Sequence, residues 1–333
     1  MTSTSDTTPT RRGATSATRW ADLARNPLVG PLAALVVAVV AFSLITDTFL
    51  RPANLSLILQ QSVVIGILAV AQTVVILTAG IDLSIGAVAV LGTIILAKVG
   101  GSHGPEVAIV AAVVTLVLVG LVNGALVAWV HLPPFIVTLG VFTAMYAATQ
   151  LYAGSQVYPV DKGILTWLGT KLSAGGLTIT TGVLAMLAIY LVAWYVLSQT
   201  AAGRHLYAVG GAPEAARLSG IRSGRVLVLT YLAAGLIAAV AAWAALGRIP
   251  NADPNAYQNA NLETITAVVI GGTSLFGGRG SVLGTLAGTL IVAVLRNGLT
   301  QAGVDNLYQN IATGVLVIAA VALDQVSRRR VQT

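Results

Sequence analysis

Residues 107–130 read VAIVAAVVTLVLVGLVNGALVAWV, a run of apolar and small side chains without one charged residue. A helix needs about 20 predominantly apolar residues to cross the hydrocarbon core of a bilayer, so this run predicts a membrane span. The whole chain of 333 residues is 56% hydrophobic and only 9% charged, whereas a soluble domain carries about 25% charged residues. The sequence therefore predicts an all-α polytopic membrane protein.

Further apolar blocks predict about ten transmembrane helices, with eight or nine as an open alternative. The third and eighth blocks are short, and each adjoins a glycine-containing break, at residues 79–82 and 276–280. Irregular backbone at membrane depth must be covered by protein or water, so we expect glycine-broken hairpins, one or both of them re-entrant. The expected spans are 28–46, 58–78, 83–98, 106–130, 134–152, 177–198, 226–247, 262–276, 281–298 and 307–324.

The charged residues predict the domain limits and the orientation. Residues 1–26 are polar and rich in Ser, Thr and Arg, which is typical of a disordered cytoplasmic tail. Residues 27–326 form the transmembrane domain, and residues 327–333 form a basic cytoplasmic tail. Arginine and lysine are more frequent in the loops on the side of the amino terminus, so the positive-inside rule predicts that both termini are cytoplasmic. The net charge of +7 is therefore assigned to cytoplasmic helix ends and not to nucleic-acid binding.

Several kinds of chemistry find no support in the sequence. The chain has no cysteine and only three histidines, which lie far apart, so we expect neither a disulfide nor a metal site. No phosphate-binding loop or catalytic motif occurs, so we expect no catalytic residue and no cofactor in this chain. Asp82 lies in an apolar region just before Leu83-Ser84-Ile85, and this position predicts that it caps a helix.

The long loop between the sixth and seventh expected spans carries a short helix signal. It reads GRHLYAVGGAPEAARLSGI over residues 203–221. Pro213 suits the first turn of a helix, Glu214 favours the positive end of its dipole, and Gly220 can end it in a left-handed conformation. A helix of about two turns is marginal alone. We therefore expect it to pack against another structure, with a helix lying on the lipid interface as the alternative.

This loop resembles the coupling loop of ATP-binding-cassette importer permeases, in which Glu-Ala-Ala is followed by three residues and Gly. The longer string resembles the ribose-type branch of bacterial sugar importers. Three further segments agree in family order: AGIDLSIG at 79–86, PPFIVTLG at 133–140 and AVVIGGTSLFGGRGSV at 267–282. Related loops often carry Asn where this chain has Ala212. The resemblance implies that the ATPase-coupling residues are Pro213, Glu214, Ala215, Ala216 and Gly220.

The same resemblance implies a function and a set of partners. The chain is expected to be the permease subunit that moves a small sugar, a pentose or a hexose, across the bacterial cytoplasmic membrane by alternating access. Its implied partners are a second permease copy in a homodimer, a cytosolic sugar-type ATPase that holds ATP and Mg, and an extracytoplasmic sugar-binding protein. Membrane lipid surrounds the subunit. A branched-chain amino-acid importer permease and a secondary transporter are the alternatives; the latter is disfavoured because intramembrane ionisable residues are scarce.

Polar residues within and between the spans are the candidate site. The loop 248–261 is expected outside and offers receptor contacts at Asn251, Asp253, Asn255 and Tyr257. Uncharged polar side chains in the spans could line the translocation path, although such groups also serve as interhelical hydrogen bonds. Because they look scattered, we expect the subunit to bind its sugar weakly, at roughly millimolar affinity or worse. The path candidates are Gln60, Gln61, Gln72, Asn123, Thr138, Tyr146, Gln150, Thr230, Tyr231, Thr273 and Asn310.

Overall fold

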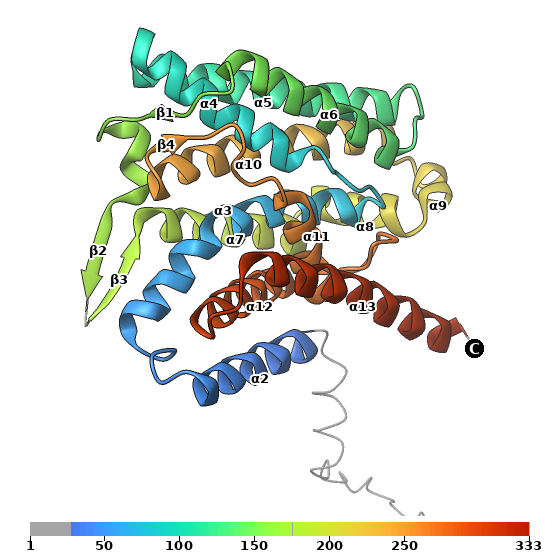
Figure 1. The fold of residues 1–333 in the computed structure, drawn as a ribbon. Helices are drawn as coiled ribbons and strands as arrows, with labels where there is room; N and C mark the ends of the chain where they lie inside the picture. Colours follow the sequence, from blue (N-terminus) through green and yellow to red (C-terminus); the bar gives the residue numbers. More distant parts are fainter. Residues whose placement is uncertain (1–27, 175, 333) are drawn as a thin grey trace, which may run out of the picture.

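The computed structural model describes residues 28–174 and 176–332. The expected tail at 1–26 lies outside the described residues. The expected tail at 327–333 continues the last helix as far as Gln332. The elements in chain order are α2 (Val29–Ile45), α3 (Pro52–Leu77), α4 (Ile85–His103), α5 (Pro105–Ala128), α6 (Pro134–Ala153), β1 (Tyr158–Pro159), the 3-10 helix η1 (Ile164–Gly169), β2 (Lys171–Ala174), β3 (Leu177–Thr180), α7 (Thr181–Gln199), α8 (Ala201–Gly211), α9 (Pro213–Leu218), α10 (Ser223–Arg248), β4 (Asn251–Ala252), α11 (Ala260–Ile270), α12 (Val282–Gln301) and α13 (Asn306–Gln332) (Figure 1).

Seven helices in the described part are long and apolar enough to cross a membrane: α3, α4, α5, α6, α7, α10 and α12. The polytopic helical class is therefore confirmed, whereas the count of ten is not. Two apolar helices, α2 with 17 residues and α11 with 11, are shorter than this criterion requires. The chain also contains two short antiparallel ladders, β1 with β4 and β2 with β3, which the sequence did not predict.

The two glycine breaks differ from the expectation in opposite ways. The third expected span is not short, because α4 continues through Gly100 and Gly101 to His103. The eighth does not run to residue 276, because α11 ends at Ile270 and Gly272 has a φ of 84°, a conformation that glycine adopts readily. At about 1.5 Å per residue, α11 is roughly 16 Å long and covers about half of the hydrocarbon core. Residues 271–281 are irregular.

Glycines allow the central helices to approach closely. On α5, a Cβ added to Gly120 would overlap the carbonyl oxygen of Tyr231 on α10, and one at Gly235 would overlap that of Leu116. On α12, Gly284 and Gly288 face the backbone of Gly271 and Ala267 in the same way. Gly120-x-x-x-Gly124 and Gly284-x-x-x-Gly288 have the spacing typical of close helix packing, and all four glycines lie at such contacts.

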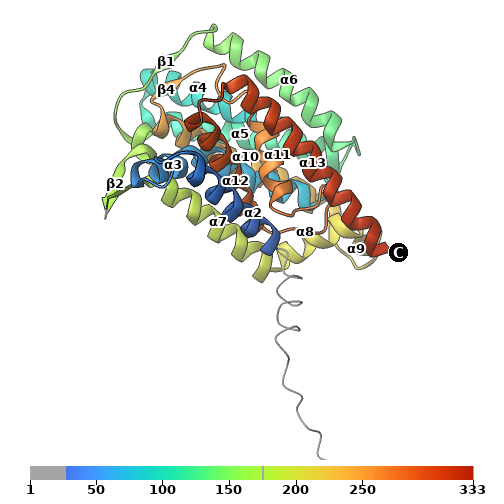
Figure 2. The same ribbon diagram turned by 60° about the horizontal axis from the view of Figure 1, so that its bottom comes forward.

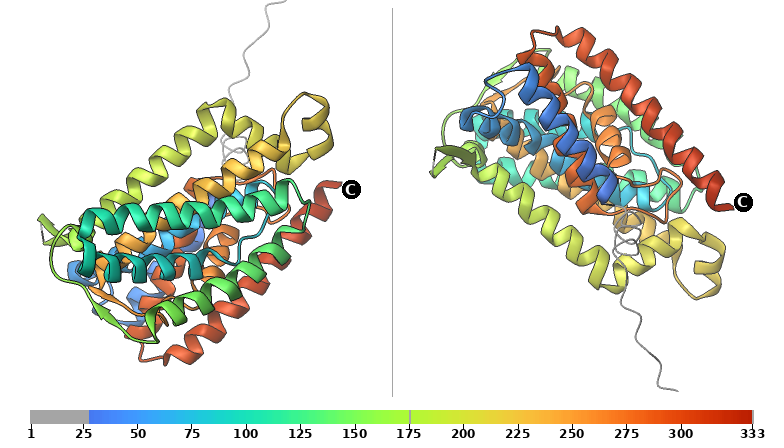
Figure 3. Two further views of the ribbon diagram at one scale, coloured as in Figure 1. Left: turned by 90° about the horizontal axis from the view of Figure 1, so that it is seen from above. Right: turned by 90° about the horizontal axis from the view of Figure 1, so that it is seen from below.

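The molecule has two distinct ends (Figures 1 and 3). One carries α8, α9 and the last turns of α13, and we call it the loop-helix end. The other carries the strands β1 to β4 and η1, and we call it the strand end. At the strand end, the indole of Trp243 on α10 donates to the carbonyl of Ile164 in η1 at 2.9 Å. Because β1 also pairs with β4, the segments 154–170 and 248–261 lie together at this end.

Candidate functional site

The expected short helix forms at the loop-helix end. It is α9, with Pro213 in its first turn. Gly220 has a φ of 82°, and the amide of Ile221 donates to the carbonyl of Ala216 at 3.0 Å, so the helix ends in the expected left-handed glycine cap. Ala216 is buried against the protein, whereas Leu218 is 81% exposed. This helix therefore presents an exposed face that includes an apolar side chain.

Sequence reasoning missed the helix that precedes it. Residues 201–211 form α8, capped by the hydroxyl of Thr200, which accepts from the amide of Gly203 at 3.4 Å. Its buried residues Leu206 and Val209 face the bundle. The apolar spacing of Leu206, Val209 and the paired glycines that follow was the available signal. The consequence is that α9 is held by a second helix and not by a flexible loop.

α8 meets both glycine breaks at one point, which we call the glycine junction: residues 77–79, 210–211 and 277–280. A Cβ added to Gly210 would overlap the carbonyl oxygen of Leu77, and one added to Gly278 would overlap the Cα of Gly211. The amide of Gly278 donates to the carbonyl of Leu77 at 3.0 Å, which satisfies a carbonyl at the end of α3. Three backbone segments are therefore in direct contact.

A tyrosine on α8 adds a side-chain tie to the junction. The hydroxyl of Tyr207 donates to the carbonyl of Gly280 at 2.8 Å. Burial raises the pKa of Tyr207 above its ordinary value, so the hydroxyl keeps its proton and remains a donor. Arg279, the residue before Gly280, is exposed. Movement of α8 must therefore displace the irregular segment that follows α11, or break this bond.

Asp82 organises the first break. Its carboxylate accepts from the amide of Ser84 at 2.8 Å and from the hydroxyl of Ser84 at 2.6 Å. Because α4 begins at Ile85, its N-cap residue is Ser84. The sequence predicted Asp82 as the cap, which is two residues too early. Asn123 on α5 donates to the Ser84 hydroxyl at 3.0 Å, and the Thr138 hydroxyl on α6 donates to the carbonyl of Ile81 at 2.9 Å.

The strand end contains a cavity of about 360 Å³, which we call the polar cavity. It lies between α3, α11, α12 and α13, under the loop 248–261. Figure 2 shows α13 lying over α11. The charged groups Arg248, Glu263 and Arg296 face it, together with six carboxamide side chains and Tyr257. Polar groups that the sequence did not single out therefore converge here, and Gln61 is the one path candidate among the residues that line the cavity.

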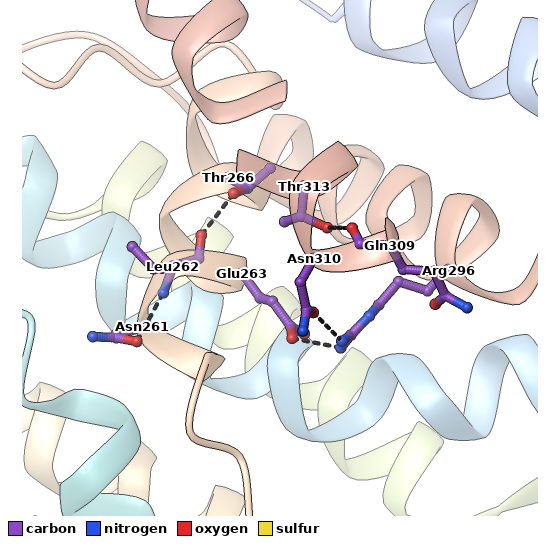
Figure 4. A network of polar contacts seen from close by, with 8 residues as sticks. All are labelled: Asn261, Leu262, Glu263, Thr266, Arg296, Gln309, Asn310 and Thr313. Atoms are coloured by element: carbon purple, nitrogen blue, oxygen red, sulfur yellow. Dashed lines mark hydrogen bonds and ion pairs between the residues drawn. The ribbon is translucent and has the colours of Figure 1, made fainter. Parts of the chain in front are cut away.

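An ion pair forms the inner wall of this cavity. Arg296 on α12 binds Oε1 of Glu263 on α11, and its second terminal nitrogen lies 3.4 Å from Oδ1 of Asn310 on α13 (Figure 4). The Glu263 side chain is 8% exposed and that of Arg296 is 33% exposed. Arg248 lies beside the Tyr257 hydroxyl; burial raises the pKa of Tyr257, and the guanidinium of Arg248 opposes that rise.

The expected path residues fall into separate surroundings. Gln61 lines the polar cavity, Asn310 belongs to its ion-pair network, and Tyr146 lines a neighbouring cavity with Thr149 and Tyr257. Others are buried: the Gln72 side chain and the hydroxyls of Tyr231 and Thr273 have no hydrogen-bond partner in the described part of the chain. Four are tied to backbone or to a neighbour: Gln60 to Thr178, Thr138 to Ile81, Gln150 to Asn255 and Thr230 to Val226.

The expected receptor contacts lie at the strand end. Asn251 is exposed in β4, and Asn255 is exposed and accepts from Gln150 at 2.8 Å. Asp253 is half-buried and accepts from the amide of Asn255 at 2.8 Å, which shapes the turn. Tyr257 points into the polar cavity and is half-buried.

Comparison of the sequence with known proteins identifies related permeases. The family model described as "Branched-chain amino acid transport system / permease component" matches residues 54–321. The chain is 44% identical over 312 residues to the fructose import permease protein FrcC of Rhizobium meliloti, covering 91% of this chain and 87% of that protein. It is 37% identical over 300 residues to the ribose import permease protein RbsC of Bacillus subtilis (strain 168), covering 89% and 92%.

A third relative carries another sugar in its name. The chain is 33% identical over 313 residues to the galactose/methyl galactoside import permease protein MglC of Escherichia coli (strain K12), covering 89% of this chain and 93% of that protein. No solved structure matches the chain. The chain therefore belongs to the family of the branched-chain amino acid transport system permease component.

Proposed function

We propose that the chain is the permease subunit of an ATP-binding-cassette importer for a small sugar, a pentose or a hexose. The observation that carries the proposal is the 44% identity over 91% of the chain to a fructose import permease. Ribose and galactose permeases follow at 37% and 33%. These relatives favour a sugar over a branched-chain amino acid, although the family description names the latter.

The loop-helix end is proposed to face the cytoplasm and to receive a separate ATPase, which holds ATP and Mg. The exposed side of α9, around Pro213, Glu214, Ala215 and Gly220, would form the contact. Because Gly210 of α8 is in contact with the backbone of Leu77, a push on α8 and α9 would reach both glycine breaks directly. Tightly packed backbone transmits such a displacement instead of absorbing it.

The strand end is proposed to face outward and to receive the sugar-binding protein at Asn251, Asp253 and Asn255. Two copies of the permease would form a homodimer and alternate between an outward-open and an inward-open packing. Each partner must then prefer one of these two states, because a partner with equal affinity for both cannot drive the change. Binding of the receptor outside and closure of the ATPase inside would supply those preferences.

Reconstitution tests this function. The full chain, its ATPase and its sugar-binding protein would be placed in vesicles, and uptake of labelled fructose, ribose and galactose would be measured with and without ATP. We expect ATP-dependent uptake of one or more of these sugars that survives collapse of the ion gradient. Uptake that follows the ion gradient and ignores ATP would instead indicate a secondary transporter.

The orientation has its own test because the chain contains no cysteine. Arg217→Cys on α9 and Asn255→Cys at the strand end are both at exposed positions. On intact cells, an impermeant maleimide should label the cysteine at position 255 and not the one at 217. The reverse pattern would invert the proposed topology.

A further inference from the structure

The polar cavity contains more hydrogen-bonding capacity than the protein itself uses. The carboxamides of Gln61, Gln258, Asn259 and Asn306 line it, and none of the four makes a side-chain hydrogen bond within the described part of the chain. Each carries both a carbonyl acceptor and an NH₂ donor. Four such groups around one space provide donors and acceptors for a ligand with many hydroxyls.

The charged wall offers further contacts. Arg296 binds Oε1 of Glu263, which leaves Oε2 of that carboxylate as a further acceptor on a residue that lines the cavity. Arg248 has no carboxylate partner within hydrogen-bonding distance among the described residues, and its guanidinium lies beside Tyr257. Guanidinium and carboxylate groups can each bind two adjacent hydroxyls, because their paired donors or acceptors have a fixed spacing.

Apolar groups complete the lining. Ile65 of α3 and Val292 of α12 contribute to it, and the half-buried Tyr257 adds an aromatic ring. A sugar presents hydroxyls at its edge and C–H groups on its faces, so it suits a cavity with both kinds of wall. A volume of about 360 Å³ is within the ordinary range for small-molecule sites. We call the exposed lining residues the rim, and these are Arg248, Asn255, Gln258, Asn259, Thr300 and Asn306.

We propose that the polar cavity is a binding site for a neutral sugar on the permease itself, at the entrance to its translocation path. The assignment rests on the proposed function, since it takes the strand end as the face that receives the substrate. The site is a low-affinity one, because the cavity is open at its rim and a bound sugar stays partly in water. Gln61 and Asn306 bind from two different helices, α3 and α13.

Protection of an introduced cysteine from labelling tests the site. Gln258→Cys and Asn306→Cys would be made separately in the full chain in nanodiscs and labelled with a small neutral maleimide. Gln156→Cys is the control, because residue 156 is exposed in a strand-end loop and does not line the cavity. At ten times its half-saturating concentration, a bound sugar should slow labelling of both cavity positions about tenfold by mass action, and leave position 156 unchanged.

A second substitution locates the contact. In the Asn306→Cys chain, Gln61→Leu should raise the half-saturating sugar concentration about fivefold, the effect of losing roughly one hydrogen bond. Gln60→Leu is the matched control, because Gln60 is the adjacent residue of α3, bonds to the carbonyl of Thr178 at 3.1 Å and does not line the cavity. An equal rise in both variants would overturn the assignment.

Four further outcomes would also overturn it. The first two are no protection by fructose, ribose or galactose, and equal protection at position 156. The third is protection by a sugar acid but by no neutral sugar, which would identify an anion site. The fourth is protection by the sugar-free binding protein alone, which would identify a docking pocket. Uptake by the assembled transporter is measured in parallel. Uptake without protection would overturn this site and leave the proposed function standing. Protection without uptake would support the site and overturn the proposed function.

Discussion

The two ends of the molecule are built in opposite ways. At the loop-helix end, glycines bring the backbone of α8 into contact with both breaks, and an added methyl group at Gly210 or Gly278 has no space. At the strand end, side chains from five helices and one loop surround a cavity, and four of its carboxamides make no side-chain hydrogen bond within the described chain. One end is closed by backbone contact, and the other is kept open by polar side chains.

This difference teaches where each kind of function can be placed. A displacement is transmitted through atoms that already touch, because packed interiors are poorly compressible. A polar ligand instead needs open space lined by donors and acceptors that the protein does not use, since each hydroxyl that leaves water must regain a hydrogen bond. α11 connects the two ends, because its first turn lines the cavity with Ala260 and Glu263 while residues 277–280 after it form part of the junction.

Four substitutions test this comparison, in order of the expected loss of stability of the permease. The largest loss is expected for Gly210→Ala, which forces a methyl group onto the carbonyl of Leu77. Overpacking of this kind costs about 1–3 kcal/mol, and α8 can relieve it only by moving off the breaks. We expect uptake by the assembled transporter to fall by at least about tenfold. Thermal unfolding and vesicle uptake are the measurements.

Gly140→Ala is the control for this experiment. Gly140 also lies in a helix, but a Cβ there meets no atom within 4 Å, and the change from Gly to Ala favours a helix. We therefore expect equal or slightly greater stability and unchanged uptake. Normal uptake by Gly210→Ala would show that the junction does not transmit the ATPase movement.

The second substitution, Glu263→Gln, acts on the wall of the polar cavity. It leaves Arg296 without its carboxylate. Breaking a fully buried ion pair costs about 3–5 kcal/mol; here we expect a smaller loss, because Arg296 is 33% exposed and can regain water. A lower unfolding temperature of the Glu263→Gln permease would show this loss of stability. The double variant Glu263→Gln with Arg296→Gln should recover part of the loss, and strictly additive losses would contradict coupling between the two side chains.

Much of the loop-helix end could be predicted from the sequence, because its signals are local. Pro213, Glu214 and Gly220 define α9 through turn chemistry that depends on a few adjacent residues. The apolar runs likewise predicted the spans of α3 to α7, because hydropathy over about 20 residues needs no partner. Each of these features is determined within a single segment.

The glycine junction and the polar cavity could not be predicted in this way. Leu77, Gly210 and Gly278 come from segments far apart in the chain, and nothing local says that they touch. Glu263 and Arg296 were not proposed as site residues at all, because each stands in a different helix and only α11 packing on α12 brings them together. The length of α11 was also misjudged, since an apolar sequence through residue 276 hides the end of the helix at Gly271.

The third substitution, Gly220→Ala, weakens the cap of α9. Gly220 has a φ of 82°, which costs about 1 kcal/mol for a residue with a Cβ. Because a Cβ there meets no atom within 4 Å, the effect is conformational and not steric. We expect a small stability loss and a reduced stimulation of ATPase activity by the sugar-loaded receptor. Gly303→Ala is the control, since Gly303 has a φ of 76° in similarly open space at the other end; it should lose similar stability but keep full stimulation.

The smallest loss of stability is expected for Ala215→Trp. Ala215 is exposed on α9, next to an exposed ion pair in which Nη2 of Arg217 lies 3.2 Å from Oε2 of Glu214. A bulky residue there touches nothing in this chain, so the unfolding temperature of the isolated permease should not change measurably. If α9 seats in the ATPase, the indole blocks the fit, and the ATPase should no longer co-purify with the permease. Ala302→Trp, also exposed but at the opposite end after α12, should leave co-purification intact. Retained co-purification and receptor-stimulated hydrolysis in Ala215→Trp would instead show that this face of α9 lies on the membrane surface and that coupling runs through another part of the loop-helix end.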